Sequence, residues 1–422
     1  MTLLLNNPWL TLLVGAGAIG LAFGAIAAAT RYCNMGAVSD WVLSGDLGRM
    51  RAWLLSIAVA IAAVAVFEFA GLFDLDQTRV NYRAAHFPWL RYLLGGLLFG
   101  IGMVLAGGCT TKTLVNIGQG DLKSLWAYLI VGVTAAALLY WPAARWFVDQ
   151  TLAWPGLSFE SLSIEHQDLG SLLAASTQGL LKASLGDWRL GTGLLFAAGL
   201  AIWLWRLDGG RHMRRTDVIG GLGIGLAIAA GWLWTGSTFG QALMSEASLA
   251  FQPPAGSGSQ SLSFVAPAAE LLRLASDPLS AWPTWLTFGI VAMLGVIFGA
   301  AFWTILRRQF CWQGFRSWSQ FGSYTAGGVL MGSGGIIAMG CSVGQGLSGT
   351  STLALGSLLA LVSIVLGAFS TLKIMLYRAL YPDSRPQQTA CALLADLRLL
   401  PARLHPFRNQ TPDGERPAGC SD

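Results

Sequence analysis

Long apolar stretches, each close to the length of a membrane-spanning helix, recur along the chain. A helix rises about 1.5 Å per residue, so about 20 apolar residues cross the roughly 30 Å of bilayer hydrocarbon. The stretches with this length and character are residues 9–29, 50–73, 89–107, 122–147, 190–207, 217–236, 284–306, 325–340 and 353–381. The pattern predicts an all-α polytopic membrane protein with about nine transmembrane helices, of which the short, glycine-rich eighth is the weakest.

The composition supports a membrane environment. Of the 422 residues, 54% are hydrophobic and 11% are charged, whereas roughly 25% of the residues in a soluble domain are charged. The formal net charge of +5 is too small to indicate a nucleic-acid partner. No Lys or Arg precedes Arg31, so the first stretch lacks the positive start of a cleaved signal peptide.

The loop charges predict the orientation, because Lys and Arg favour cytoplasmic loops. Residues 206–215 contain four arginines and residues 307–316 contain three, whereas residues 149–187 and 237–283 are long and mainly acidic. We therefore expect the N-terminus and both acidic segments outside, and the C-terminus in the cytoplasm. Only the loop with Arg79 and Arg83 opposes this orientation.

The same pattern predicts the domain organisation. A transport domain spans residues 1–382, with halves at about 1–148 and 284–382, and residues 149–283 contribute inserted external segments and two further spans. Residues 383–422 form a cytoplasmic tail with a basic amphipathic run. The run either lies on the membrane surface, docks a partner or is untethered.

A glycine-rich segment that ends in cysteine occurs twice. Residues 95–109 and 327–341 are identical at eight of 15 positions, including the final Gly-Cys pairs Gly108-Cys109 and Gly340-Cys341. Each pair is followed by a polar run that interrupts the helix. Irregular backbone at membrane depth persists only where it is buried in protein or lines a cavity, and broken helices in duplicated folds mark transporter binding sites. The repeat predicts two pseudo-symmetric arms with short re-entrant helices. The orientation from the loop charges makes these arms antiparallel, with the two cysteines facing each other near the membrane midplane.

A fainter pair shares the pattern aromatic-Cys-x-x-Gly, at Cys33 and Cys311, each after a span that contains Phe-Gly-Ala. We interpret this pair as further support for a two-half plan.

These motifs resemble the YeeE/YedE family of sulfur-compound membrane transporters. The resemblance lies in residues 95–120 and 327–357 and in the two aromatic-Cys-x-x-Gly elements, about a fifth of the chain. It implies a bacterial inner-membrane protein that takes up thiosulfate or a related sulfur anion past cysteines at re-entrant helices. It also implies a cytoplasmic TusA-like sulfur carrier as a partner. Lys112 departs from the small residue expected there, and the insertion at 149–187 has no counterpart in the family.

The chemistry of a sulfur dianion explains why such residues suit its transport. Its charged oxygens suit the N–H groups at a helix N-terminus and the hydroxyls of Thr110, Thr111 and Ser342. A thiol is a weak donor on a polarizable atom, which suits the soft sulfur end. Lys112 is either a counter-charge for the substrate or an inner-surface topology residue. The candidate substrate-binding residues are Cys109, Cys341, Cys311, Cys33, Gly108, Gly340, Thr110, Ser342 and Lys112.

Other interpretations remain open. A buried cysteine is often just a small hydrophobic residue; the matched arms favour a functional role for Cys109 and Cys341, and Cys311 ranks above Cys33. Glu68 is either a proton-coupling carboxylate or a paired structural group. A soft-metal transporter would also use thiols, and a membrane sulfurtransferase would form a persulfide on cysteine. We expect no enzyme activity, no cofactor and no metal.

Overall fold

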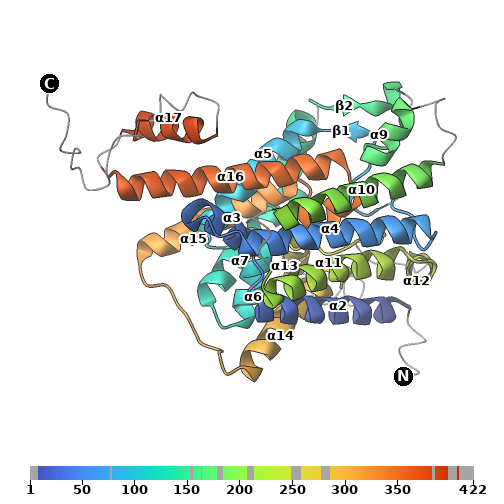
Figure 1. The fold of residues 1–422 in the computed structure, drawn as a ribbon. Coiled ribbons are helices and arrows are strands. Elements are labelled where there is room, and N and C mark those ends of the chain that lie inside the picture. Colours follow the sequence, from blue (N-terminus) through green and yellow to red (C-terminus); the bar gives the residue numbers. More distant parts are fainter. Residues whose placement is uncertain are drawn as a thin grey trace, which may run out of the picture.

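Long helices that run roughly along one direction make up most of the molecule (Figure 1). The computed structural model describes residues 8–76, 78–152, 155–162, 164–177, 184–206, 213–248, 258–276, 286–382, 385–397 and 406–407. The long helices are α2 (Pro8–Thr30), α4 (Gly48–Phe69), α5 (Trp89–Leu105), α7 (Leu122–Tyr140), α10 (Leu185–Arg206), α11 (Arg215–Gly236), α14 (Phe288–Leu306), α15 (Trp318–Ile337) and α16 (Leu355–Leu380).

Shorter elements connect them. These are α3 (Asn34–Ser44), α6 (Thr110–Gly118), α8 (Pro142–Phe147), η1 (Val148–Leu152), η2 (Phe159–Leu162), α9 (Leu169–Ser176), α12 (Thr238–Ser248), α13 (Ala266–Ser276), η4 (Gly344–Gly349), η5 (Thr350–Thr352) and α17 (Pro386–Asp396). Strands β1 (His86–Phe87) and β2 (Leu157–Ser158) form a two-residue antiparallel pair, in which His86 pairs with Ser158.

Eight helical stretches of the described residues are long and apolar enough to cross a membrane. They correspond to eight of the nine predicted spans and confirm an all-α polytopic membrane protein. The exception is the weak eighth span, which lies in α15. This helix has 20 residues, long enough to cross, but its Gly, Ser and Tyr residues make it less apolar than the other spans. The outward-facing side chains are apolar, with Leu195 77% and Phe298 62% exposed, as expected where lipid replaces water.

Helices α5 and α15, which contain the repeated segments, pack antiparallel through their glycines. A Cβ added to Gly95 would lie 2.8 Å from the carbonyl oxygen of Gly334, and one added to Gly327 would lie 2.7 Å from that of Gly102. Gly327 and Gly334 are the repeat equivalents of Gly95 and Gly102, so the two contacts exchange under a twofold rotation. This confirms the pseudo-symmetry that the repeat predicts for the arms.

The helices that follow the two arms in the chain, α7 and α16, pack with the same twofold symmetry. Gly96 of α5 lies against Ala360 of α16, and Gly328 of α15 lies against Ala127 of α7; an added Cβ would be 2.9 and 2.8 Å from the respective carbonyl oxygens. Close backbone approach of this kind requires small residues. Each arm therefore packs on the helix that follows the other arm.

The fainter cysteine pair does not belong to this symmetry. The helices before Cys33 and Cys311 are α2 and α14, and they run parallel: Gly20 lies against Ala292 and Gly24 against Val296. The twofold that relates the arms reverses direction, so it does not superpose α2 on α14. Our interpretation of that pair as support for a two-half plan is wrong, because the shared pattern arises at two unrelated helix ends.

The described part of the tail docks on the chain itself. The Lys373 ammonium of α16 lies 3.1 Å from the Asp396 carboxylate of α17, and the Phe407 ring stacks on Tyr381 with centroids 4.2 Å apart. Of the predicted amphipathic run, the residues beyond 397 lie outside the described residues.

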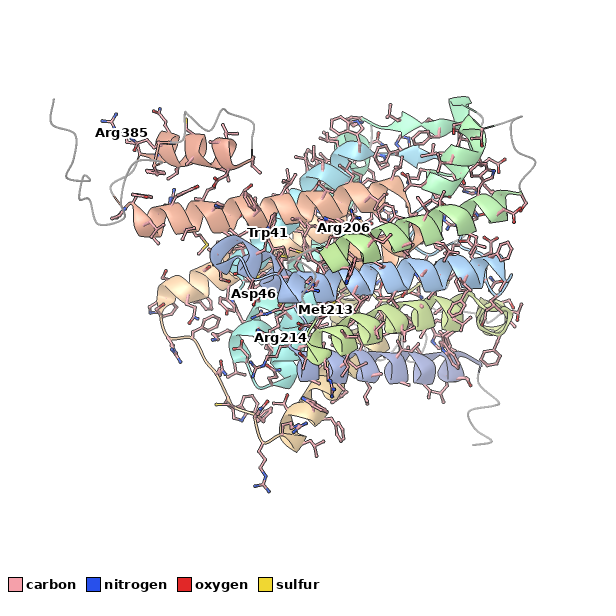
Figure 2. All side chains as sticks on the ribbon, viewed as in Figure 1. Trp41, Asp46, Arg206, Met213, Arg214 and Arg385 are labelled. Carbon is pink, nitrogen blue, oxygen red and sulfur yellow. The ribbon has the colours of Figure 1, made fainter. Side chains whose placement is uncertain are left out.

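The basic loop predicted inside joins α10 to α11. Figure 2 shows Arg206, at the end of α10, and Arg214, just before α11, at the end of the bundle where Asp46 also lies. Helix α2 begins at the opposite end, on the right of Figure 1, and α16 ends on the left. The first and last long helices thus place their outer termini at opposite ends of the bundle.

Candidate functional site

Three buried cysteines each precede a helical segment: Cys33 before α3, Cys109 before α6 and Cys341 before η4. The sulfur of Cys33 accepts a hydrogen bond from the backbone N–H of Gly36 at 3.2 Å. The sulfur of Cys341 likewise accepts from the N–H of Gly344 at 3.3 Å. A cysteine here replaces the usual Ser, Thr or Asp cap, so a soft sulfur atom faces N–H groups.

Cys109 joins the first and last parts of the chain. Its side chain interacts with those of Cys33 and Ser342, and its sulfur lies near the backbone N–H groups of Thr111 and Lys112. None of the N–H groups of α6 has hydrogen-bond geometry to that sulfur. The Cys109 thiol is thus placed among donors that it does not use as a conventional cap.

Several buried polar atoms around these thiols have no hydrogen-bond partner within the described residues. They are Asn34 Oδ1, Thr110 Oγ1, Thr111 Oγ1 and Ser342 Oγ, on residues at most 2% exposed. The Asn34 amide donates to the Ser342 carbonyl oxygen at 3.3 Å, which links α3 to the re-entrant segment. Buried polar groups are normally satisfied by protein or water, so this cluster is suited to receive a polar ligand.

Lys112 brings a positive charge to the cluster. Its side chain is partly buried and close enough to Cys33 for a direct electrostatic interaction. In the described part of the chain, no ion pair or hydrogen bond engages its ammonium. The Lys112 stem crosses Gly108, where an added Cβ would be 3.0 Å from Lys112 Cγ. The glycine at position 108 therefore leaves room for the lysine.

Gly340 has a comparable packing role in the second arm. An added Cβ there would lie 3.1 Å from the Gln345 backbone nitrogen, and the Gln345 side chain donates to the Ala338 carbonyl oxygen at 2.7 Å. The arm then turns at Met339, whose φ is +59°. The chain turns back on itself here, and Cys341, which follows the turn, is 0% exposed.

One end of a large cavity lies at this turn. It has a volume of about 800 Å³, Met339 and Gly340 lie in its lining, and Tyr82 and Ser263 form part of its wall. The Tyr82 hydroxyl donates to the Gly344 carbonyl oxygen at 3.0 Å. The cavity therefore reaches the re-entrant segment that follows Cys341, and it stops short of the buried Cys341 thiol.

Cys311 is separate from the three buried cysteines. It is exposed, and its thiol donates to the carbonyl oxygen of its neighbour Trp312 at 3.8 Å. Its backbone N–H donates to Gln119 at 3.3 Å, just beyond α6, a helix about 13 Å long at 1.5 Å per residue. The structure thus brings Cys33, rather than Cys311, to Cys109.

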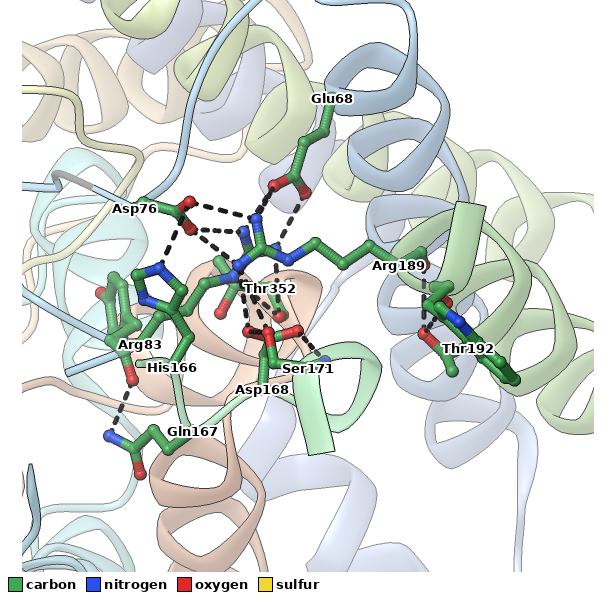
Figure 3. A network of polar contacts seen from close by, with 12 residues as sticks. Glu68, Asp76, Arg83, His166, Gln167, Asp168, Ser171, Arg189, Thr192 and Thr352 are labelled. Carbon is green, nitrogen blue, oxygen red and sulfur yellow. Dashed lines mark hydrogen bonds and ion pairs between the residues drawn. The ribbon is translucent and has the colours of Figure 1, made fainter. Parts of the chain in front are cut away.

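Glu68 is paired, as one of our two interpretations predicts. Arg83 Nη1 and Nη2 lie 2.5 and 2.9 Å from its carboxylate oxygens, and Arg189 Nη1 lies 3.2 Å away. Asp76 and Asp168 complete the ion-pair cluster shown in Figure 3. Burial raises the pKa of Asp168, but the Arg83 and Arg189 charges outweigh burial and hold it below its usual value.

Asn34 and the arginines of the large cavity were not predicted as site residues from the sequence. Asn34 directly follows Cys33, and its link to residue 342 is a long-range contact that spacing does not reveal. Among the described residues, no group of three or more His, Cys, Asp or Glu side chains is arranged to hold a metal ion.

The sequence of this chain is similar to one protein family and to several individual transporters. The profile of a family described as sulphur transport matches residues 29–370. A thiosulfate transporter, TsuA, of Escherichia coli is 30% identical over 166 residues, which are 39% of this chain and 43% of that protein. TsuA of Spirochaeta thermophila is 26% identical over 35% of this chain and 41% of that protein. A probable transporter, YedE, of E. coli is 29% identical over 32% of this chain and 31% of that protein. The matches thus span less than half the length of each of these relatives.

Proposed function

Because the chain belongs to the sulphur-transport family, we propose that it takes up thiosulfate or a related sulfur anion along a cysteine-lined pathway. The main support is the interaction of Cys109 with Cys33 and Ser342, beside buried hydroxyls that have no hydrogen-bond partner in the described part of the chain. The names of the TsuA relatives, thiosulfate transporters, support this substrate class.

The pathway begins in the large cavity, passes Cys341 and continues to Cys109 and Cys33. The thiols contact the soft sulfur end of the anion, while Thr110 and Ser342 donate to its oxygens. Thiol donors are weak, so each contact is easily exchanged, and conduction requires weak, multiple sites. The N-termini of α3 and α6 and the Lys112 ammonium supply positive potential. Sulfate lacks the soft end and fits this arrangement less well.

The proposal includes an orientation and a partner. Residues 149–187 and 237–283 and the N-terminus lie outside the inner membrane of a bacterium, and the C-terminus lies in the cytoplasm. The anion leaves on the face rich in arginine, where a TusA-like sulfur carrier would receive it. The charge distribution supports the orientation, and the resemblance to the YeeE/YedE family supports the carrier.

Uptake of radiolabelled thiosulfate into proteoliposomes tests this pathway. We expect Cys109→Ala and Cys341→Ala to reduce uptake strongly, because each removes a thiol from the proposed route. Cys391→Ala is the matched control, since Cys391 is exposed on α17. If both pathway variants transport thiosulfate as fast as the wild type, the cysteine-lined pathway is wrong.

Mass spectrometry distinguishes transport from sulfur transfer. In a sulfurtransferase, a thiolate takes the sulfane sulfur of thiosulfate, the S–S bond breaks and sulfite leaves with the electron pair. A lasting adduct of one sulfur atom on Cys109 or Cys341 would contradict simple permeation. The proposal expects both thiols to remain unmodified after uptake.

A further inference from the structure

The large cavity has a positively charged wall. Four arginines line it, namely Arg79, Arg91, Arg145 and Arg273, against two carboxylates, those of Asp149 and Glu270. A cavity lined by charge of one sign raises the local concentration of the opposite ion. An anion is therefore favoured in this space over a cation.

Glu270 is already engaged within the wall. Its carboxylate forms an ion pair with Arg79 and accepts a hydrogen bond from the Thr287 hydroxyl at 2.6 Å. Arg79 also donates to the Gln260 side chain at 2.9 Å. This pair is fixed by its partners, so it contributes little free charge to the cavity.

Arg91 is held differently. Its Nε donates to the Ile337 carbonyl oxygen at 3.2 Å, three residues before Gly340 at the end of the cavity. Its Nη1 lies 3.5 Å from Asp149, at the outer limit of a hydrogen bond. The side chain is 14% exposed, while that of Asp149 is 47% exposed. The guanidinium is thus anchored through Nε and keeps its other N–H groups for a second acceptor.

Asp149 is shared between two arginines. Arg145 Nε also lies 3.5 Å from its carboxylate, and the Arg145 side chain is 71% exposed. Long, exposed ion pairs of this kind contribute little stability. Asp149 is therefore a counter-ion that is easily displaced, on η1 in the inserted segment.

We propose that Arg91 forms an entry site for a sulfur oxoanion, and that the dianion displaces Asp149 from Arg91 when it binds. The guanidinium offers two parallel N–H donors to two oxygens of one anion, directly above the turn that leads to Cys341. A dianion outcompetes a singly charged carboxylate held at 3.5 Å. The site rests on the proposed function and adds to it a first binding step.

Two variants at this pair have opposite expected effects. Arg91→Gln removes the cation and should raise the KM for thiosulfate uptake about tenfold with Vmax unchanged. Asp149→Asn removes the competitor and should lower the KM about threefold. Arg378→Gln is the matched control, because it removes one arginine charge at the exposed far end of α16. The wild-type KM should also rise with added salt more steeply than that of Arg91→Gln.

Equilibrium binding separates this site from the transport step. Thiosulfate binding to the purified full chain, measured calorimetrically, should weaken in Arg91→Gln, tighten in Asp149→Asn and stay unchanged in the control Arg378→Gln. Both Arg91→Gln and Asp149→Asn should keep the wild-type melting temperature, which excludes misfolding as the cause.

The inference is overturned if both variants keep the wild-type KM and affinity, or if both change in the same direction. If the wild type takes up thiosulfate and both variants keep its KM and affinity, the entry site is rejected and the proposed function stands. Absence of wild-type thiosulfate uptake would reject the proposed function, while the binding measurement would still decide the entry site.

Discussion

The two re-entrant segments arise from one repeated motif but are built differently. The first, after Cys109, is the regular helix α6, whose start is supported by its own Thr113 hydroxyl bonding to the Cys109 carbonyl oxygen at 2.9 Å. The second, after Cys341, consists of η4 and η5, contains three glycines and ends at Leu353 with a φ of +54°. The first segment is stabilised locally, whereas the second needs support from elsewhere.

That support comes from Arg83 and from the inserted segment at 149–187. The Arg83 guanidinium donates to the Thr352 carbonyl oxygen at 3.4 Å, and the Leu169 N–H donates to that of Leu353 at 3.2 Å. The Leu355 N–H in turn donates to the Gln167 carbonyl oxygen at 3.1 Å. The insertion and the ion-pair cluster of Figure 3 therefore hold the second segment in place. Stabilising contacts from distant parts of the chain are therefore concentrated at the second segment, whereas the first carries the Lys112 charge, which has no ion pair within the described residues.

The largest expected effect is on the cluster that holds the second segment. Arg83→Gln leaves Glu68 without its main partner and removes an ion pair of Asp76, in a site where the Arg83 side chain is 3% exposed. Breaking a buried ion pair on one side costs about 3–5 kcal/mol, so the melting temperature should fall sharply. A melting temperature equal to that of the wild type would show that the ion-pair cluster does not hold this segment.

The next effect concerns charge at the first segment. Lys112→Gln should reduce thiosulfate uptake roughly thirtyfold, the equivalent of about 2 kcal/mol, because a buried dianion loses its counter-charge. The melting temperature should stay unchanged, since Lys112 has no ion pair to lose within the described residues. Lys112→Arg should recover part of the uptake. Equal uptake by wild type and Lys112→Gln would assign Lys112 to topology alone.

A smaller effect distinguishes Cys33 from Cys311, the two cysteines of the aromatic-Cys-x-x-Gly pattern. Cys33→Ala should reduce uptake about fivefold, as for one lost hydrogen bond of about 1 kcal/mol, because the Cys33 side chain lies near that of Cys109. Cys311→Ala should change uptake less than twofold, since Cys311 is exposed and apart from the site. A larger loss of uptake in Cys311→Ala than in Cys33→Ala is the order that the sequence pattern alone predicts. That result would place the pathway along the outside of α6, beside Cys311.

The smallest effect is a dependence of stability on pH. The pKa of Asp168 is lowered in the folded protein, so its contribution to stability is present above its unfolded pKa of about 3.9 and is lost as the pH falls through the folded value. The melting temperature should therefore drop more steeply below about pH 4 in the wild type than in Asp168→Asn. Parallel curves for the two proteins would exclude Asp168 as the titrating group.

Much of the fold could be predicted because periodicity is local. Eight spans and the antiparallel arms follow from apolar length and from the register of residues 95–109 with 327–341. The pairing of Cys33 with Cys109 could not be predicted, since nothing in the spacing links α3 to the repeat. The sequence pattern ranks Cys311 above Cys33, whereas Cys33 is the cysteine that lies near Cys109.

The arginines of the cavity were hidden for a different reason. A rule based on loop charge counts Arg79 and Arg83 as evidence on orientation, and it does not distinguish an arginine in a buried pair from one that lines a cavity. Arg83 is tied to Glu68, whereas Arg79 and Arg91 lie in the cavity wall. Only the three-dimensional contacts separate these roles.

The most direct measurement is a structure of the protein with selenosulfate, whose terminal selenium is visible by anomalous scattering. We expect a selenium peak in contact with the sulfur of Cys109 and beside the Ser342 hydroxyl, with the oxygens near Lys112. A selenium peak elsewhere in the bundle and none beside Cys109, under conditions in which the protein transports the anion, would contradict the cysteine-lined pathway.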